Sequence, residues 1–268
     1  MKKIFLFLAL LPAVWSHAQN TGFTTAEVTI NPLISGTLYT PENANAKTRL
    51  VILIAGSGPT DRNGNQYGMP NNSLKLLSEY LAQHGTAVYA YDKRILALAK
   101  TGKLEEKNLS FSDYITDAQT AIDFFKAKKT YDKVIVAGHS EGSLIGMVAA
   151  NGHADGYVSI SGAGRPIDQV IMQQLDGQPQ EYKDKARAYF SKLAKGETFK
   201  VDDPSMNVLF RESVQPYMIS WIKYDPKAEI AKLKIPVLLV NGTKDLQVAV
   251  SEAELLKAGK PDALLQII

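Results

Sequence analysis

Short, continuously apolar segments alternate with amphipathic segments along most of this chain. A strand that is buried on both faces needs continuous rather than alternating apolarity, and 50–54 and 133–137 are such runs. The segments that the pattern predicts as strands are 27–30, 34–39, 50–54, 87–91, 133–137, 157–160, 236–240 and 263–268. Because predicted strands and helices alternate, we expect an α/β fold with a mainly parallel sheet covered by helices on both faces.

Three of the intervening segments carry helix signals. Residues 73–84 place their leucines on one helical face, and Gly85 follows as a stop. A second helix is expected from Ser110, because Asp113 completes a capping box and the later apolar positions follow the helical period. A third helix is expected over 141–151.

The region 165–225 interrupts this alternation. It contains no buried-strand run, and its segments 169–175, 182–193 and 213–224 favour helices. Insertions at the carboxyl edge of an open α/β sheet line the ligand crevice. We therefore expect a helical cap rather than a plain surface excursion. The expected organisation is a leader at 1–18, a first core part at 19–164, the cap at 165–225 and a second core part at 226–268.

The amino terminus has the pattern of a secretory signal peptide. Lys2 and Lys3 precede an apolar stretch at 4–15, and a small-x-small cleavage site at 16–18 follows. Twelve apolar residues are too few to span a bilayer as an uncleaved anchor. We expect cleavage, no stable membrane span afterwards, and a periplasmic or secreted bacterial protein.

Composition removes several function classes. With no cysteine, a disulfide scaffold, a lipoprotein and a thiolate metal site are excluded. The formal charge of +3 falls to about +1 without Lys2 and Lys3, which leaves 28 basic against 27 acidic residues. The densest basic run, 126–133, is typical of a solvated helix end. We therefore expect no nucleic-acid partner, which would need a clustered basic face.

The segment 138–142, Gly-His-Ser-Glu-Gly, fits the G-x-S-x-G motif. The motif is informative only between a buried strand and a helix, where a sharp turn exposes the serine hydroxyl above the sheet. Here an apolar run ends at Ala137 and a predicted helix begins at Glu141. Ser140 is therefore the candidate nucleophile, and a simple helix N-cap is the alternative.

An attacking serine needs hydrogen-bond donors for the anion that forms on the carbonyl oxygen. The backbone N–H of Glu141 is one candidate, because it lies at a helix N-terminus. The N–H of Ser57 is the second, with Gly56 as the near alternative, because flanking glycines let the backbone approach a ligand closely. An ordinary glycine turn is the competing interpretation. The Glu141 side chain is expected to be a first-turn helix carboxylate rather than a general acid.

The acidic partner of the serine should follow a later strand. Asp245 comes shortly after the predicted strand 236–240 and is the candidate, with a turn aspartate as the alternative. The segment starting at Asp61 resembles a calcium loop, but its sixth position is Gln66 and its twelfth is Asn72, so no metal is implied. We expect Asp61 and Arg62 to hold the oxyanion loop instead.

Three motifs together identify a family resemblance. They are Gly-Ser-Gly-Pro-Thr-Asp-Arg-Asn-Gly at 56–64, Tyr-Asp-Lys-Arg at 91–94 and Gly-His-Ser-Glu-Gly at 138–142. The chain resembles secreted bacterial α/β-hydrolases of the serine esterase and acyl-peptidase type, with 213–217, Trp221 and 225–226 similar to the end of their cap.

The resemblance implies the α/β-hydrolase fold and hydrolysis of short acyl esters by a Ser–Asp–His triad without a cofactor. It assigns Ser140 as nucleophile, Asp245 as acid, and Ser57 and Glu141 as backbone donors. Relatives continue Asp-Lys-Arg with a glycine-rich turn, whereas this chain has Ile-Leu-Ala-Leu at 95–98, so we expect a different loop there.

The triad histidine is the second departure from the family pattern. The four histidines are His17, His84, His139 and His153, and none follows Asp245, where the family places its base. The chain ends in a predicted core strand, so we expect a truncated form rather than a natural pseudoenzyme.

Three functions are consistent with these features. The first is a serine esterase scaffold for small acyl esters. The second is a peptidase of the same fold, for which Glu181, Arg211 and Glu212 are available to bind peptide termini. The third is a non-catalytic binding protein that kept the pocket and lost the base.

The missing base predicts that the 268-residue chain is nearly inactive on esters. Removal of a triad base costs about four to six powers of ten in turnover, because only oxyanion stabilisation and binding are left. The measurement is release of p-nitrophenol from p-nitrophenyl acetate. Rapid hydrolysis that depends on Ser140 would contradict this expectation.

Overall fold

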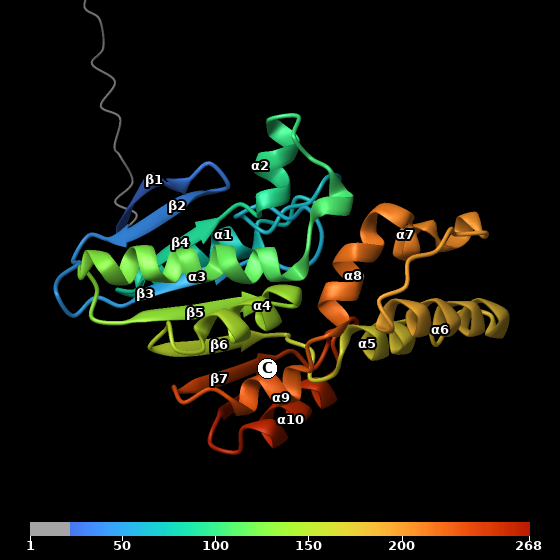
Figure 1. The fold of residues 1–268 in the computed structure, drawn as a ribbon. Helices are drawn as coiled ribbons and strands as arrows, with labels where there is room; N and C mark the ends of the chain where they lie inside the picture. The colour runs from blue at the N-terminus through green and yellow to red at the C-terminus, as the bar shows by residue number, and fades with distance from the viewer. Residues whose placement is uncertain (1–21) are drawn as a thin grey trace, which may run out of the picture.

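The computed structural model describes residues 22–268, so the predicted leader at 1–18 lies outside the described residues. One eight-stranded sheet has the order β1-β2-β4-β3-β5-β6-β7-β8 (Figure 1). Its strands are β1 (Phe23–Asn31), β2 (Ile34–Pro41), β3 (Leu50–Ile54), β4 (Ala87–Tyr91), β5 (Val134–His139), β6 (Gly156–Ile160), β7 (Val237–Asn241) and β8 (Leu264–Ile267). β2 pairs antiparallel with β1 and β4, and all other neighbours are parallel. The predicted α/β fold is confirmed.

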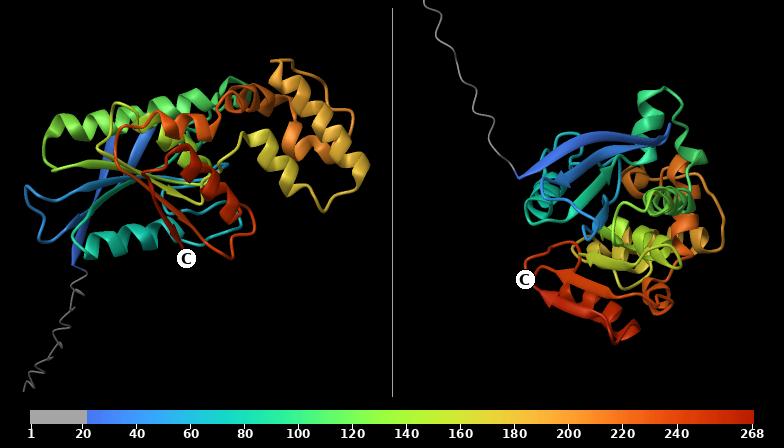
Figure 2. Two further views of the ribbon diagram at one scale, coloured as in Figure 1. Left: turned by 90° about the horizontal axis from the view of Figure 1, so that it is seen from below. Right: turned by 90° about the vertical axis from the view of Figure 1, so that its left-hand side faces the viewer.

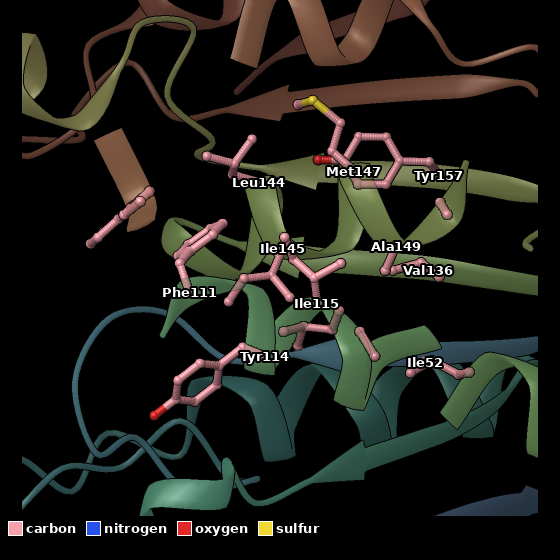
Figure 3. Close-up of a cluster of buried hydrophobic side chains, with 14 of the residues drawn as sticks. Ile52, Phe111, Tyr114, Ile115, Val136, Leu144, Ile145, Met147, Ala149 and Tyr157 are labelled. Carbon is pink, nitrogen blue, oxygen red and sulfur yellow. The ribbon is translucent and has the colours of Figure 1, made fainter. Parts of the chain in front are cut away.

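Helices lie on both faces of this sheet. α1 (Ser73–Gln83) covers one face and α3 (Phe111–Lys128) the other, as the left view of Figure 2 shows. On the α3 side, α4 (Glu141–Ala150) packs on β5 and β6, while α9 (Pro226–Ala231) and α10 (Val250–Gly259) lie towards β7. The face carrying α3 holds the larger core, in which Phe111, Ile145 and Val136 are fully buried (Figure 3).

The strand pattern follows from this two-sided burial. All five residues of β3 and all five of β4 are buried, which accounts for their continuous apolarity. Burying one such aliphatic side chain contributes about 1.5–3 kcal/mol relative to leaving it exposed. Alternate side chains of β3 therefore enter opposite cores, with Ile52 on the α3 side and Leu53 on the α1 side.

The beginning of α3 confirms the predicted capping box. The Ser110 hydroxyl accepts the backbone N–H of Asp113, and the Asp113 carboxylate accepts the Ser110 N–H at 2.8 Å. These reciprocal bonds satisfy two of the N–H groups that lack an intrahelical partner.

Three helices of the core were not predicted. α2 (Arg94–Lys100) occupies the segment where the chain departs from the family pattern; its five consecutive apolar residues, 95–99, show no helical period, and none of its residues is buried. The sequence signal for α9 is its N-cap residue Asp225, whose carboxylate accepts two backbone N–H groups. Pro226 follows at the first helical position. α10 follows the loop that contains Asp245.

The region between β6 and β7 is helical. It contains α5 (Ile167–Gln174), α6 (Gln180–Ala194), α7 (Asn207–Phe210) and α8 (Gln215–Ile222), with short 3₁₀ turns η2 (Pro204–Met206) and η3 (Glu212–Val214). These helices project beyond one end of the sheet (Figures 1 and 2). Tyr189, Phe190 and Phe210 pack in their interior with ring centroids 4.8–5.2 Å apart. Within residues 22–268, no helix has the length and apolarity that crossing a membrane requires.

A contact between Glu106 and Arg211 joins the cap to the core. Glu106 lies in the 3₁₀ turn η1 (Glu106–Asn108), and its carboxylate accepts hydrogen bonds from the Arg211 guanidinium and the Ser213 hydroxyl. The bond from Arg211 is the largest cause that lowers the pKa of Glu106 below its ordinary value of 4.5, and partial burial opposes it.

This contact predicts that acid loosens the cap. Because the folded pKa of Glu106 is depressed, its stabilisation is fully present above pH 4.5 and is lost as the pH falls below that value. The pair is partly exposed, so it contributes at most about 1 kcal/mol. Hydrogen–deuterium exchange corrected for intrinsic rates should show faster exchange over 207–214 below pH 4.5, with α4 unchanged.

The Glu106→Gln variant should exchange fast over 207–214 already at pH 7. Asp184→Asn removes the exposed pair of Asp184 with Arg187 on α6 and serves as the matched control, which should leave this segment unchanged. Equal exchange over 207–214 in Glu106→Gln and the wild type at pH 7 would disprove the coupling.

Candidate active site

Ser140 lies on a strained turn between β5 and α4. Its backbone has φ 54° and ψ −118°, a conformation that is unfavourable for a residue with a Cβ. The Ser140 N–H donates to the Ile160 carbonyl at 2.9 Å, which fixes the turn to β6. Ser140 occupies the N-cap position, but its side chain makes no capping hydrogen bond. Its hydroxyl is therefore available to a ligand, in contrast to that of an ordinary N-cap serine.

The two glycines of the motif are required by close backbone approaches. A Cβ on Gly138 would lie 2.0 Å from the carbonyl oxygen of Gly142. A Cβ on Gly142 would lie 2.5 Å from the carbonyl oxygens of Ile54 and Ala55. Each position would therefore clash with backbone atoms if it carried any other residue, so the turn depends on both glycines.

The loop after β3 lies beside this turn. A Cβ on Gly56 would lie 3.0 Å from the His139 ring and 3.4 Å from the Ser140 Cβ. The Ser57 carbonyl accepts hydrogen bonds from the side chains of Thr60 and Gln66. Within residues 22–268, the Ser57 N–H has no hydrogen-bond acceptor.

Glu141 contributes the second backbone N–H beside Ser140. It is the first residue of α4, so its N–H has no intrahelical acceptor. Ser57 and Glu141 line the same two cavities. The structure therefore brings together Ser140, Ser57, Gly56 and Glu141, four of the five residues that the sequence singled out.

The end of β4 anchors three neighbouring elements through consecutive residues. Asp92 accepts the backbone N–H and the guanidinium of Arg62, which holds the loop after β3. Lys93 binds the Gly56 carbonyl and the Glu141 carboxylate. Arg94 forms two hydrogen bonds with Asp117 on α3.

The expected role of Arg62 in holding the loop agrees with these contacts. Its guanidinium also binds Glu27 and the Ser35 carbonyl, which connects the loop to β1 and β2. Asp61 accepts the N–H groups of Asn63 and Asn65 at 2.8 Å and so closes the turn.

The Glu141 side chain is more than a first-turn helix carboxylate. It is 2% exposed and pairs with the 3% exposed Lys93 at 2.5 Å. Its other oxygen accepts the hydroxyl of Tyr217 from α8. The sequence interpretation of this side chain was therefore incomplete, because both partners come from distant segments.

Asp245 lies in the loop that follows β7. Its carboxylate accepts the backbone N–H groups of Gln247 and Val248 at 2.9 Å and a hydrogen bond from the Ser161 hydroxyl. Burial raises the pKa of Asp245, but these hydrogen bonds outweigh it, so the pKa lies below the ordinary value of 3.8. Asp245 is therefore ionised near neutral pH, as an acid that orients a histidine must be.

None of the three histidines in the described residues donates to or accepts from the Ser140 hydroxyl. His84 binds the Tyr80 carbonyl at the end of α1, and His153 pairs with Asp123. His139 ends β5. Neighbouring atoms keep water from its ring and so lower its pKa below 6.5, and the negative charge of Asp245 opposes that shift. His139 is thus the histidine of this group that lies within the field of Asp245.

Two cavities meet above the nucleophile. The nucleophile chamber, of about 310 Å³, is lined by Ser140, Leu144, Arg165, Ile171, Trp221 and Val248. The aromatic chamber, of about 210 Å³, is lined by Lys93, Leu109, Tyr114, Val214, Tyr217 and Trp221. Both chambers also contact Ser57, Glu141, Leu209 and Met218. The cap therefore forms a roof over both chambers, because Leu209, Met218 and Trp221 belong to α7 and α8.

Sequence reasoning missed Lys93, Tyr217 and Ser161 as parts of this site. Lys93 and Tyr217 stand in segments that the family resemblance quotes, so a signal was present, but their contacts with Glu141 were not readable from it. Ser161 directly follows β6 and has φ 48°, a left-handed conformation that no sequence pattern indicated. Within residues 22–268, no group of three or more histidine, cysteine, aspartate or glutamate side chains is placed to hold a metal ion.

Comparison with known proteins identifies esterases among the relatives. Esterase EstD of Thermotoga maritima is 27% identical over 251 residues, which are 89% of this chain and 56% of EstD. The chain thus spans a little over half the length of this curated relative.

Solved structures share the fold at low identity. Est1E from Butyrivibrio proteoclasticus has a TM-score of 0.60 at 16% identity and covers 91% of this chain and 88% of its own. Dienelactone hydrolase from Anabaena variabilis has a TM-score of 0.54 at 18% identity, covering 92% and 86%. These likenesses establish an α/β-hydrolase fold.

The family model described as serine aminopeptidase, S33, matches residues 70–215, which are more than half of the chain. This match contains the nucleophile turn and most of the cap. The chain therefore belongs to the serine aminopeptidase S33 family of α/β-hydrolases.

Proposed function

We propose that this protein hydrolyses short acyl esters through a covalent acyl-enzyme on Ser140. The observation that carries the proposal is the strained turn that leaves the Ser140 hydroxyl uncapped in a chamber which Ser57 and Glu141 also line. Strain of this kind persists where the surrounding structure enforces it, and it is common at catalytic positions.

The proposed reaction has two steps. The Ser140 Oγ attacks the ester carbonyl carbon while its proton passes to the triad histidine that the family pattern requires. The carbon–oxygen bond to the alcohol then breaks, and the alcohol leaves with the proton that this histidine returns. Water then attacks the acyl-enzyme and releases the carboxylic acid. In both steps negative charge develops on the carbonyl oxygen. We assign the N–H groups of Ser57 and Glu141 as the donors that hydrogen-bond to this oxygen.

The two chambers suit an ester substrate. They meet at Ser57 and Glu141, so a carbonyl placed there extends its two substituents into different cavities. The larger volume of the nucleophile chamber, about 310 Å³, suits a short acyl or alcohol group. Trp221 and Met218 separate the two spaces from the cap side, which favours small, uncharged substituents.

Charge around the nucleophile favours an ester over a peptide with a free amino terminus. An aminopeptidase needs an unpaired carboxylate for the substrate ammonium. The Glu141 carboxylate is neutralised by Lys93 and that of Glu106 by Arg211. Two carboxylates that the sequence offered for peptide termini, those of Glu181 and Glu212, line cavities that Ser140 does not line.

The first test is covalent trapping on a form of the protein that carries the triad histidine of the family pattern. Incubation with p-nitrophenyl butyrate should add one butyryl group, located at Ser140 by peptide mapping, because Ser140 lines the chamber that Ser57 and Glu141 also line. Ser140→Ala should carry no adduct and lose ester hydrolysis. An adduct at another residue, or equal hydrolysis by Ser140→Ala and the wild type, would disprove the proposal.

The second test concerns the charge of Asp245. Asp245→Asn keeps an oxygen acceptor for the N–H groups of Gln247 and Val248 but removes the charge. In a form of the protein that carries the triad histidine of the family pattern, the turnover number should fall by about 10⁴, because the triad acid orients and stabilises that base. The melting temperature should change by only a few degrees, since the loop keeps its hydrogen bonds.

Asp225→Asn is the matched control for this variant. Asp225 also accepts two backbone N–H groups, but it caps α9 and makes no contact with Ser140. The control should retain full turnover. A similar loss of turnover in both variants would show that the effect of Asp245→Asn comes from loop structure and not from charge at the site.

A further inference from the structure

The ammonium of Lys93 is bound at the centre of the site. It is 3% exposed, and it donates to the Gly56 carbonyl at 2.9 Å and to the Glu141 carboxylate at 2.5 Å. The ring of Tyr114 lies 4.9 Å from the ammonium and adds a cation–π contact. Lys93 therefore contacts both segments that carry the proposed oxyanion donors.

The contact with Gly56 acts on the donor of the next residue. The Gly56 carbonyl and the Ser57 N–H belong to one peptide unit, which is planar and trans, so the two groups point in opposite directions. Fixing the carbonyl oxygen on Lys93 therefore fixes the direction of the Ser57 N–H. A charged donor on the carbonyl also polarises the amide and makes its N–H a stronger donor.

The contact with Glu141 acts on the second donor. The carboxylate is held by Lys93 on one oxygen and by the Tyr217 hydroxyl on the other. The backbone N–H of the same residue begins α4, next to Ser140. One buried ammonium thus connects the Ser57 peptide and the first residue of α4 to a common point just after β4.

We propose that Lys93 is a positioning residue that sets the geometry of the oxyanion hole. The inference rests on the proposed ester hydrolysis and assigns Lys93 no contact with the substrate's reacting atoms. A buried ion pair is by itself weak support for stability, since replacement by apolar groups of similar size is often neutral. The effect on the oxyanion hole comes from the hydrogen bond between Lys93 and the Gly56 carbonyl. An apolar side chain in place of Lys93 cannot form this bond.

The test is the double variant Lys93→Met/Glu141→Gln. Removing Lys93 alone would leave the Glu141 carboxylate buried without a counter-charge, which destabilises proteins strongly. The double variant removes both charges, keeps similar side-chain volumes and leaves an oxygen for Tyr217. Circular dichroism and thermal melting establish that it is folded.

Two readouts separate positioning from general structural support. The substrate is p-nitrophenyl acetate, and the protein form is the one that carries the triad histidine. For the double variant, kcat should fall about 10- to 100-fold, while KM should change less than about threefold. The reason is that oxyanion contacts form in the transition state. The dissociation constant for n-butylboronic acid, which forms a tetrahedral adduct on Ser140, should rise by a similar factor. The second readout does not depend on turnover.

Arg94→Met/Asp117→Asn is the matched control. This pair also starts at the end of β4 and is largely buried, but it contacts α3 rather than Gly56. It should keep the wild-type kcat and boronate affinity. The positioning role is wrong if the folded Lys93 double variant keeps kcat and boronate affinity within about threefold of the wild type. It is also wrong if KM rises while kcat is unchanged.

A measurement on the wild type covers the case in which the double variant does not fold. In protein labelled with ¹⁵N-serine, the Ser57 amide proton should shift downfield when n-butylboronic acid binds. An unshifted Ser57 signal in the bound state overturns the proposal. Failure of ester hydrolysis itself is distinguished by Ser140→Ala: if that variant hydrolyses esters and binds the boronate like the wild type, the proposed function fails and not merely the role of Lys93.

Discussion

The buried pair of Lys93 and Glu141 links four separate segments at the carboxyl edge of the sheet. An ammonium and a carboxylate that are removed from water are costly unless they are paired and their remaining hydrogen-bonding capacity is used. Both conditions are met, because Lys93 also binds the Gly56 carbonyl and Glu141 also binds Tyr217. The four residues come from the segment after β4, from α4, from the loop after β3 and from cap helix α8. A shift of any one of these segments would therefore break a contact of the pair.

The position of the site follows from the parallel sheet. The carboxyl ends of parallel strands meet at one edge, so β3, β4, β5, β6 and β7 bring their following loops together there. β5 supplies Ser140, β6 supplies Ser161, and β7 supplies the loop with Asp245. The Ser140 N–H donates to Ile160 and the Ser161 N–H to Val240, so each of these residues is held by the neighbouring strand, whereas Asp245 accepts N–H groups of its own loop.

The helical region between β6 and β7 lines both chambers. Its residues Leu209, Met218 and Trp221 contact both chambers, while Tyr217 reaches the buried pair. The S33 family name denotes aminopeptidases, whereas the relative EstD is an esterase. In this chain the Glu141 carboxylate is paired with Lys93.

Local features of this protein were readable from the sequence, and contacts between distant segments were not. Continuous apolarity defined β3 and β4 to the residue, the reciprocal capping bonds of Ser110 marked α3, and the segment 138–142 defined the nucleophile turn. Each of these depends on neighbouring residues, because period, capping and backbone crowding act over a few positions. The pairing of Glu141 with Lys93 and Tyr217 spans 48 and 76 residues, so only the folded sheet and cap bring these side chains together. Helix α2 escaped prediction for a different reason: its five consecutive apolar residues, 95–99, show no helical period.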